Sequence, residues 1–365
     1  MTNKTISLLA AAALMLSASC TSEKGGLPVI DLAANVNAEN TAKIDSILDV
    51  RLVLHPEATD STLIGSLDLA GIVDDNYFIY SFDGNMMVFA KDGKCLCSFD
   101  RKGYGPGEYG SYASPMADRA TKGWAAFSNT QPKVFTYTMS GEFTGCDTLQ
   151  VRGIPTALGN GWVVGSNSFI NDTISYYYYS DKFLITDSLK TGMLYKVFRE
   201  YDGATVFGPN ISSTGNLATV YWNDTIYDIT DPAAGLRPLA AVNLGTLGMP
   251  WDFNPAQNRD KVDSYIDASV YSTATRYLVW MKYDHKLYAQ FYDRATGSLL
   301  ASISAPREKG QPYGVPFSFN GSTIYLTPAY YTTDDTFYFT ASDATMSELT
   351  GKEDSNPALF AIKIK

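Results

Sequence analysis

The sequence has 365 residues, with 28 basic and 38 acidic side chains and a formal net charge of −10. Phosphate backbones and anionic headgroups repel a chain this acidic, so the composition argues against nucleic acid and anionic membrane surfaces as partners. Only 18% of the residues are charged, whereas 13% are aromatic, with 29 glycines and 25 tyrosines. Because aromatic residues fit strands and glycine fits tight turns, we predict an all-β protein with many short hairpins.

Residues 1–19 have the pattern of a secretory signal peptide. Lys4 is the only early charge, and residues 6–18 are apolar or small. A membrane-spanning helix needs about 20 apolar residues, and this run is shorter. It ends at Leu16-Ser17-Ala18-Ser19-Cys20, where small residues before a cysteine resemble the lipobox of bacterial lipoproteins.

This resemblance implies that Cys20 is the lipid attachment residue. Each buried methylene contributes about 0.8 kcal/mol, so several acyl chains on one residue attach a protein stably to a membrane. We therefore predict that residues 20–44 are the lipidated cysteine and a tether. The predicted location is the cell envelope, with the lipid in the outer membrane and the protein periplasmic or surface-exposed. The alternative is an ordinary cleaved signal peptide followed by a chance cysteine.

Short strand patterns recur through residues 45–365 at hairpin spacing. In the first full unit, Tyr77-Phe78-Ile79-Tyr80 leads through Asp83-Gly84-Asn85 into Met86-Met87-Val88-Phe89, and Asp-Gly between apolar runs is a strong hairpin signal. Similar units return about every 45 to 55 residues, a period typical of propeller blades. We therefore predict a single six-bladed β-propeller domain with four-stranded antiparallel blades.

Ring closure is expected to involve the N-terminal strand. The last unit, from Ser322 to Ile364, lacks one strand, while residues 47–54 form a strand pattern before the first full unit. We predict that this strand completes the last blade, because joining the chain ends in one sheet leaves no exposed edge. Residues 248–267 interrupt the pattern and are predicted to be a surface insertion with a short helix around residues 257–265.

One motif carries a family resemblance. Phe89-Ala90-Lys91-Asp92-Gly93-Lys94 precedes Asp100-Arg101-Lys102-Gly103-Tyr104-Gly105-Pro106-Gly107-Glu108-Tyr109. Together they resemble the blade signature of NHL- and TolB-like propellers, in particular the six-bladed β-propeller lipoproteins of Gram-negative gut bacteria. The resemblance implies a fold and a cell-envelope location, but no reaction. The glycines are expected to let the chain turn sharply between blades. A phosphate loop is excluded, since no Lys-Ser/Thr follows and no helix is predicted.

Catalytic patterns are sparse. His55 and His285 are the only histidines, neither lies in a recognisable motif, and no Gly-x-Ser-x-Gly elbow occurs. The remaining enzymatic alternative is a Ca²⁺-dependent hydrolase or lyase of the lactonase kind, using oxygen ligands in the central channel. Its candidate ligands are acids and amides placed near inner-strand starts: Asp74, Asp75, Asp118, Asn160 and Asn320. No cofactor is predicted otherwise.

Cysteine spacing gives no zinc site. Cys95 and Cys97 alternate along one strand, so they share a face and do not easily bridge each other. A bridge from Cys146 to either of them, or three free thiols, remain the alternatives.

Non-catalytic binding is therefore the predicted function. We expect a monomer that binds a glycan, a peptide or an envelope protein on one face of the ring and touches the membrane only through its lipid. A structural role in an envelope complex is the further alternative. The candidate ligand-binding residues lie in the glycine-rich motif, the insertion and a late loop: Arg101, Tyr104, Glu108, Tyr109, Trp251 and Tyr313.

Overall fold

The structure is a computed structural model, and it describes most of the chain from residue 26 onward. The described residues are 26–38, 44–81, 84–149, 154–158, 161–168, 173–180, 184–194, 197–198, 205–206, 210–213, 217–222, 224–231, 234, 237–250, 258–308, 310, 312–333, 335–353 and 355–365.

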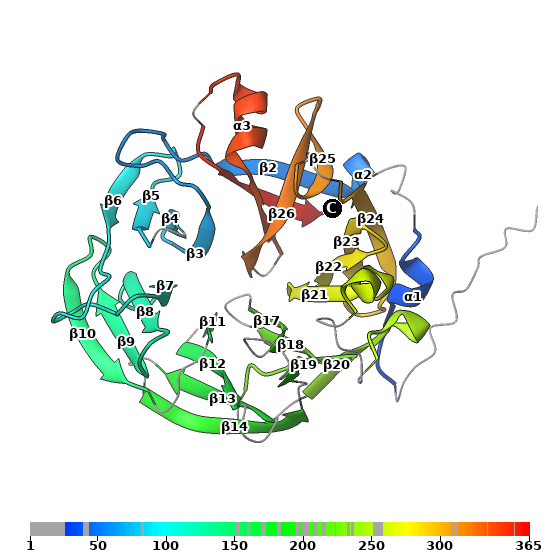
Figure 1. Ribbon diagram of the computed structural model, residues 1–365, viewed down its shortest axis with the longest axis horizontal. Helices are drawn as coiled ribbons and strands as arrows, with labels where there is room; N and C mark the ends of the chain where they lie inside the picture. Colours follow the sequence, from blue (N-terminus) through cyan, green and yellow to red (C-terminus); the bar gives the residue numbers. More distant parts are fainter. Residues whose placement is uncertain are drawn as a thin grey trace, which may run out of the picture.

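Antiparallel sheets stand around a ring, each running from an inner to an outer strand (Figure 1). Four sheets have four strands, two have five and a short one has two, counted over the described residues. The first four-stranded sheet holds β3 (Asp68–Val73), β4 (Asn76–Tyr80), β5 (Met86–Phe89) and β6 (Cys95–Phe99), and the second holds β7 (Ala113–Asp118), β8 (Gly123–Ser128), β9 (Lys133–Tyr137) and β10 (Phe143–Thr148). The third holds β11 (Ile154–Leu158), β12 (Gly161–Ser168), β13 (Thr173–Ser180) and β14 (Leu184–Leu194). The fourth holds β21 (Asp267–Ser272), β22 (Arg276–Tyr283), β23 (Lys286–Asp293) and β24 (Leu299–Pro306).

The two five-stranded sheets each recruit an N-terminal strand. One holds β17 (Asn210–Ser213), β18 (Ala218–Trp222), β19 (Thr225–Asp228), β20 (Arg237–Asn243) and β1 (Val29–Asp31); the other holds β25 (Val315–Phe319), β26 (Ser322–Thr332), β27 (Phe337–Ala341), β28 (Ala358–Ile364) and β2 (Leu48–Leu54). The two-stranded sheet pairs β15 (Val197–Phe198) with β16 (Thr205–Val206). This arrangement confirms an all-β propeller with four-stranded blades as the basic unit.

The chain ends meet in one sheet, as predicted. β2 pairs antiparallel with β28, in a register from Leu48 opposite Ile364 to Leu54 opposite Leu359. The sequence prediction assigned no strand to β25, which pairs with the first half of β26 and forms the other edge of this sheet. The N-terminal strand therefore covers the outer edge of the last blade.

Part of the predicted tether belongs to the folded domain. β1 pairs in parallel with β20, and Ile30 and Leu32 are fully buried. Asp31 accepts a hydrogen bond from the Ala34 N–H at 2.9 Å and caps α1 (Leu32–Asn35). The prediction of a tether over residues 20–44 is wrong for Val29–Val36, because the apolar residues of this segment pack against a blade.

Large side chains fill the spaces between neighbouring sheets. Trp124 is fully buried, and its ring centre lies 4.9 Å from that of Phe78 in the preceding sheet. Gly71 allows these two sheets to approach, since a Cβ at this position would lie 2.6 Å from the Cβ of Ala117. Packing between blades therefore accounts for buried aromatic residues such as Trp124 and Phe78.

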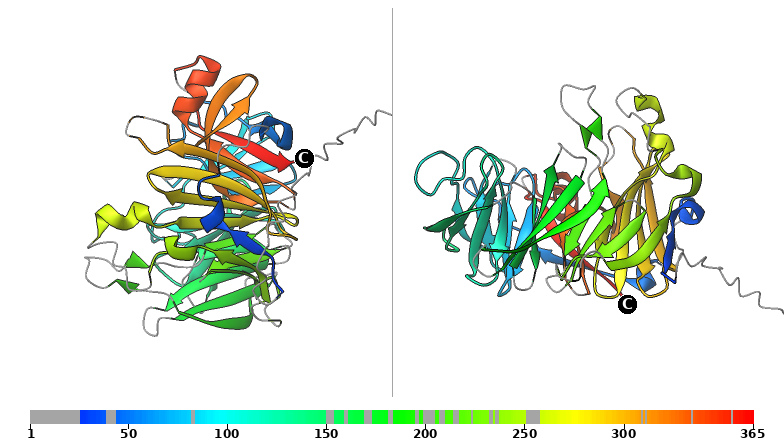
Figure 2. Two further views of the ribbon diagram at one scale, coloured as in Figure 1. Left: turned by 90° about the vertical axis from the view of Figure 1, so that its right-hand side faces the viewer. Right: turned by 90° about the horizontal axis from the view of Figure 1, so that it is seen from below.

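The ring has two distinct faces (Figure 2). One face carries the sheet-to-sheet connections, such as residues 100–112 and the 3-10 helix η3 (Arg259–Ser264), and we call it the loop face. The turn face carries the inner hairpin turns, such as residues 74–75, and the outer turn 294–298. The short helices α2 (Ile44–Ile47), α3 (Asp343–Thr350) and η2 (Gly245–Leu247) lie outside the sheets.

Candidate functional site

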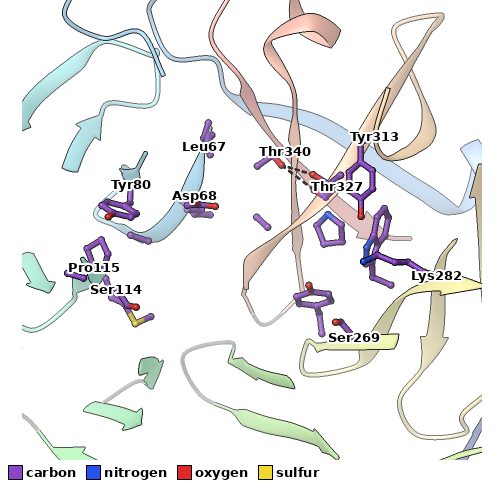
Figure 3. Close-up of a pocket in the computed structure, with 18 of the residues that line it drawn as sticks. Leu67, Asp68, Tyr80, Ser114, Pro115, Ser269, Lys282, Tyr313, Thr327 and Thr340 are labelled. Atoms are coloured by element: carbon purple, nitrogen blue, oxygen red, sulfur yellow. Dashed lines mark hydrogen bonds between the residues drawn. The ribbon is translucent and has the colours of Figure 1, made fainter. Parts of the chain in front are cut away.

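A cavity of about 640 Å³ lies at the centre of the ring (Figure 3). Its walls come from the first residues of β3, β7 and β21, the end of β22 and the middle of β26. Inner strands begin at the loop face, so the cavity belongs to the loop-face half of the central channel. Strands far apart in the sequence therefore build one concave site.

Aromatic rings and hydroxyl groups dominate the cavity wall. Tyr80, Tyr271, Trp280 and Tyr313 line it from four different segments, together with hydroxyl side chains such as Ser269. Trp280 and Tyr271 are buried, whereas Tyr313 is 58% exposed. Rigid aromatic faces beside hydroxyl groups suit ligands that have both apolar and hydrogen-bonding surface.

The charged side chains of the cavity do not balance. Lys282 pairs with Asp267 at 3.8 Å. Asp68 also lines the cavity, and its carboxylate forms no hydrogen bond or ion pair with any residue in the described part of the chain. Asp68 is exposed to the cavity, yet the surrounding protein removes enough water to raise the pKa of the carboxyl. The described wall therefore carries one uncompensated negative charge.

Hydrogen bonds fix the end of β26 below the cavity. Arg119 donates to the Tyr331 hydroxyl at 2.8 Å, and the Thr332 hydroxyl donates to the Ser272 carbonyl at 2.9 Å. The Ser272 N–H in turn donates to the Ser212 hydroxyl at 3.0 Å. The first two bonds connect β26 to two other blades, and the third connects β21 to β17, so the segment that follows Pro328 and Ala329 in the wall is held rigidly.

Three predicted ligand-binding residues instead hold the glycine-rich loop together. Arg101 donates to the Gly141 carbonyl at 3.1 and 2.8 Å, and Glu108 accepts from the Gly105 N–H at 2.7 Å. Tyr109 is fully buried, with its hydroxyl 3.1 Å from Asp100 Oδ1. Burial and the Asp100 charge raise the pKa of Tyr109 far above its usual range. The prediction that Tyr109 binds a ligand is therefore wrong. The side chains of Arg101 and Glu108 form hydrogen bonds with backbone groups of the protein.

The other predicted residues divide by location. Tyr104 is 79% exposed on the glycine-rich loop, where its hydroxyl lies 2.9 Å from that of Ser111. Tyr313 lines the cavity. Trp251 and Cys20 lie outside the described residues. Of the six ligand-binding candidates, the structure thus places Tyr313 at the cavity.

The suggested Ca²⁺ ligands occupy turns. Asp74 and Asp75 have φ values of 49° and 61° in the turn after β3, and Asp118 accepts from Ala120 N and Thr121 Oγ1 in the turn after β7. They lie at inner-strand ends, not starts, which corrects the prediction. Asn320 lies in the β25–β26 turn, and Asn160 is outside the described residues. Within the described segments no three His, Cys, Asp or Glu side chains cluster as metal ligands would.

The three cysteines of the described segments, Cys95, Cys97 and Cys146, are free thiols. Cys97 lies beside Cys95 on β6, and its thiol donates to the Met139 carbonyl at 2.9 Å. Burial raises the pKa of Cys97 to about 11. Cys146 is exposed and also free. The alternative of three free thiols is therefore the one found in the structure, and a bridge from Cys146 to Cys95 or Cys97 is not.

A family model for a domain of unknown function, DUF4934, matches residues 27–363. The chain belongs to the DUF4934 family. No curated protein matches it. No helix in the described part of this DUF4934 protein is long and apolar enough to cross a membrane.

Two solved structures resemble the DUF4934 chain over most of its length. A Bacteroides fragilis protein whose name marks it as exported gives a TM-score of 0.66 at 20% identity, covering 92% of this chain and 99% of that chain. A member of the DUF4221 family from Bacteroides vulgatus gives a TM-score of 0.52 at 10% identity, covering 87% of this chain and 99% of that one. At these identities the likeness concerns the fold alone.

Sequence reasoning missed most of the DUF4934 cavity. Asp68 and Lys282 were not candidates, and the sequence favoured packing between blades for Trp280. One local signal was present, because Trp280 and Lys282 are two residues apart on one strand and so share a face. Nothing in the sequence placed Asp68 opposite them, because that requires knowing which strands surround the channel.

Proposed function

We propose that this DUF4934 protein is a non-catalytic binding module whose ligand, a small glycan or a peptide segment, enters the cavity at the loop face. The observation that carries this proposal is the cavity of about 640 Å³ with aromatic walls, hydroxyl groups and an unpaired carboxylate. Ligand pockets commonly measure about 300–1,000 Å³ and combine apolar walls with a few placed polar groups. The rigid ends of β26 and β21 favour a preformed site, which lowers the ordering cost of binding.

Isothermal titration calorimetry of the purified full chain in detergent micelles, against neutral and charged oligosaccharides and short peptides, tests the proposal. Tyr313→Ala is expected to weaken binding, because it removes an exposed aromatic face from the cavity wall. Tyr104→Ala is the matched control, since it removes an exposed tyrosine outside that wall. Absence of heat with every ligand class, or equal losses in the two variants, would contradict a ligand site in the cavity.

We further propose that Cys20 is lipidated and holds the protein at the outer membrane. Support comes from the lipobox-like sequence and from the exported Bacteroides neighbour. β1 runs parallel to β20, and Gly297 in the turn 294–298 lies against the Val29 carbonyl, so the chain enters the ring near the turn face. A protein held this way would present its cavity away from its membrane.

We also propose that the ring has six blades. The sheets of four or five strands support this number, and their inner strands β3, β7, β11, β17, β21 and β26 contact one another in succession around the channel. A crystal structure of the protein tests the count directly.

A further inference from the structure

We propose that the cavity selects ligands carrying a protonated amine, which pairs with the Asp68 carboxylate. This inference rests on the proposed binding function and names the chemistry of its ligand. The recognised group is an ammonium, whether it comes from an amino sugar or from a peptide amino group.

Charge in the cavity points to a cationic ligand. Lys282 is already paired with Asp267 at 3.8 Å, so it offers no free partner to Asp68. The Asp68 carboxylate has no hydrogen-bond or ion-pair partner within the described residues. A partly desolvated carboxylate without a partner is unfavourable, and a cation that enters the cavity relieves that penalty. An anionic ligand would add to it.

The arrangement of the walls matches an ammonium group. Figure 3 places Asp68 and Tyr80 on one side of the cavity and Tyr313 and Lys282 on the opposite side. The Asp68 carboxylate on the same side as the Tyr80 ring gives an ammonium both a charge-assisted hydrogen bond and an aromatic face.

Asp68 is also expected to lower the stability of the free protein. Partial desolvation by the cavity wall raises the pKa of its carboxyl, so the charged form disfavours the folded state at neutral pH. A residue that destabilises the empty fold while facing a cavity fits a ligand-binding role, since folding alone does not require the charge.

The experiment uses calorimetry of the full chain with two pairs of probes. One pair is a glucosamine tetramer and its fully N-acetylated form, and the other is trialanine amide with a free or an acetylated N-terminus. The variants are Asp68→Asn, which keeps the side-chain shape, and Asp74→Asn, which removes an equal charge on the turn face. Asp74 is exposed and has a φ of 49°, a conformation that asparagine adopts readily.

The expected result is that at least one amine probe binds and that its acetylated partner binds at least about tenfold more weakly, the size of one lost charge-assisted hydrogen bond. Asp68→Asn lowers amine affinity by a similar factor while its melting temperature stays equal or rises, and Asp74→Asn keeps the affinity. The probe pair that responds identifies the source of the amine. Equal binding of amine and acetylated probes, with no effect of Asp68→Asn, overturns the inference and leaves the binding function standing. If neither amine probe binds, the inference is also overturned. The wider panel of oligosaccharides and peptides then tests the proposed binding function separately.

Discussion

Asn356 and Ile64, which lie almost at opposite ends of the domain sequence, are joined by a hydrogen bond: the Ile64 N–H donates to Asn356 Oδ1 at 2.9 Å. Asn356 Nδ2 also donates to the carbonyls of Glu57 at 2.8 Å and Thr62 at 2.7 Å. The asparagine is 1% exposed and lies just before β28, whereas its partners lie just before β3. One side chain thus satisfies three backbone groups at the junction of the last and first blades.

Replacing Asn356 with alanine is expected to destabilise the ring. The substitution leaves three backbone groups without their partner, with a cost on the order of 3 kcal/mol. Asn129→Ala is the control, because Asn129 is exposed and its side chain makes one long hydrogen bond to Ser114. Urea denaturation followed by far-ultraviolet circular dichroism measures both. Similar unfolding midpoints for the two variants would show that Asn356 does not stabilise the closure.

Stability is expected to depend on pH through Asp68. Its folded pKa is raised above the unfolded value, so in the interval between the two the folded state binds more protons. This group therefore lowers the free energy of unfolding as pH rises through that interval, and its penalty is absent below the unfolded pKa. Asp68→Asn is expected to remove this contribution and raise stability at pH 7. Denaturation curves of both proteins at pH 4 and pH 7 check this. The prediction would be refuted if the free energy of unfolding changed equally between the two pH values in the wild type and in Asp68→Asn.

The two tyrosines of the glycine-rich motif are expected to respond differently to loss of their hydroxyls. Tyr109→Phe removes a buried hydroxyl beside Asp100 and the Gly84 carbonyl, at a cost of about 1 kcal/mol. Tyr104→Phe removes an exposed hydroxyl and is expected to leave the melting temperature unchanged within error. Differential scanning calorimetry measures both variants. A larger drop in melting temperature for Tyr104→Phe than for Tyr109→Phe would contradict this prediction, because it would give the exposed hydroxyl the larger role in stability.

Membrane attachment is expected to depend on Cys20. Cys20→Ala removes the thiol that would carry the lipid, so the protein should move from the membrane fraction to the soluble fraction after carbonate washing. Cys95→Ala is the control, because Cys95 is a half-buried free thiol within a blade. Mass spectrometry of the N-terminal peptide identifies the modification. Continued sedimentation of Cys20→Ala with membranes would argue for the ordinary cleaved signal peptide.

The membrane-attached protein is expected to turn its cavity outward. A fluorophore at Ala295→Cys, in the turn whose Gly297 lies against the Val29 carbonyl, should be quenched more strongly by quencher-bearing lipids than one at Tyr313→Cys at the cavity. The native thiols Cys95, Cys97 and Cys146 are replaced by serine in both proteins. Stronger quenching at position 313 would reverse the proposed orientation.

Local sequence determined the strands, the repeat and the closing strand. Alternating apolar residues and Asp-Gly turns depend on neighbours a few positions apart, so β4 and β5 were predictable from the first full unit. β2 was recognisable because its pattern stood alone before that unit and a propeller with an open seam would leave strand edges exposed. The same reasoning missed β1, since a three-residue strand carries too little pattern.

Only the tertiary structure decided which residues face the cavity. Asp68, Trp280 and Tyr313 come from three different blades, and their meeting depends on the order of the sheets around the ring. Tyr104 and Tyr109 looked equivalent in one glycine-rich motif, yet one is 79% exposed and the other fully buried. The direction of each side chain there follows from contacts with Gly84 and Ser111, and local sequence pattern does not encode such contacts.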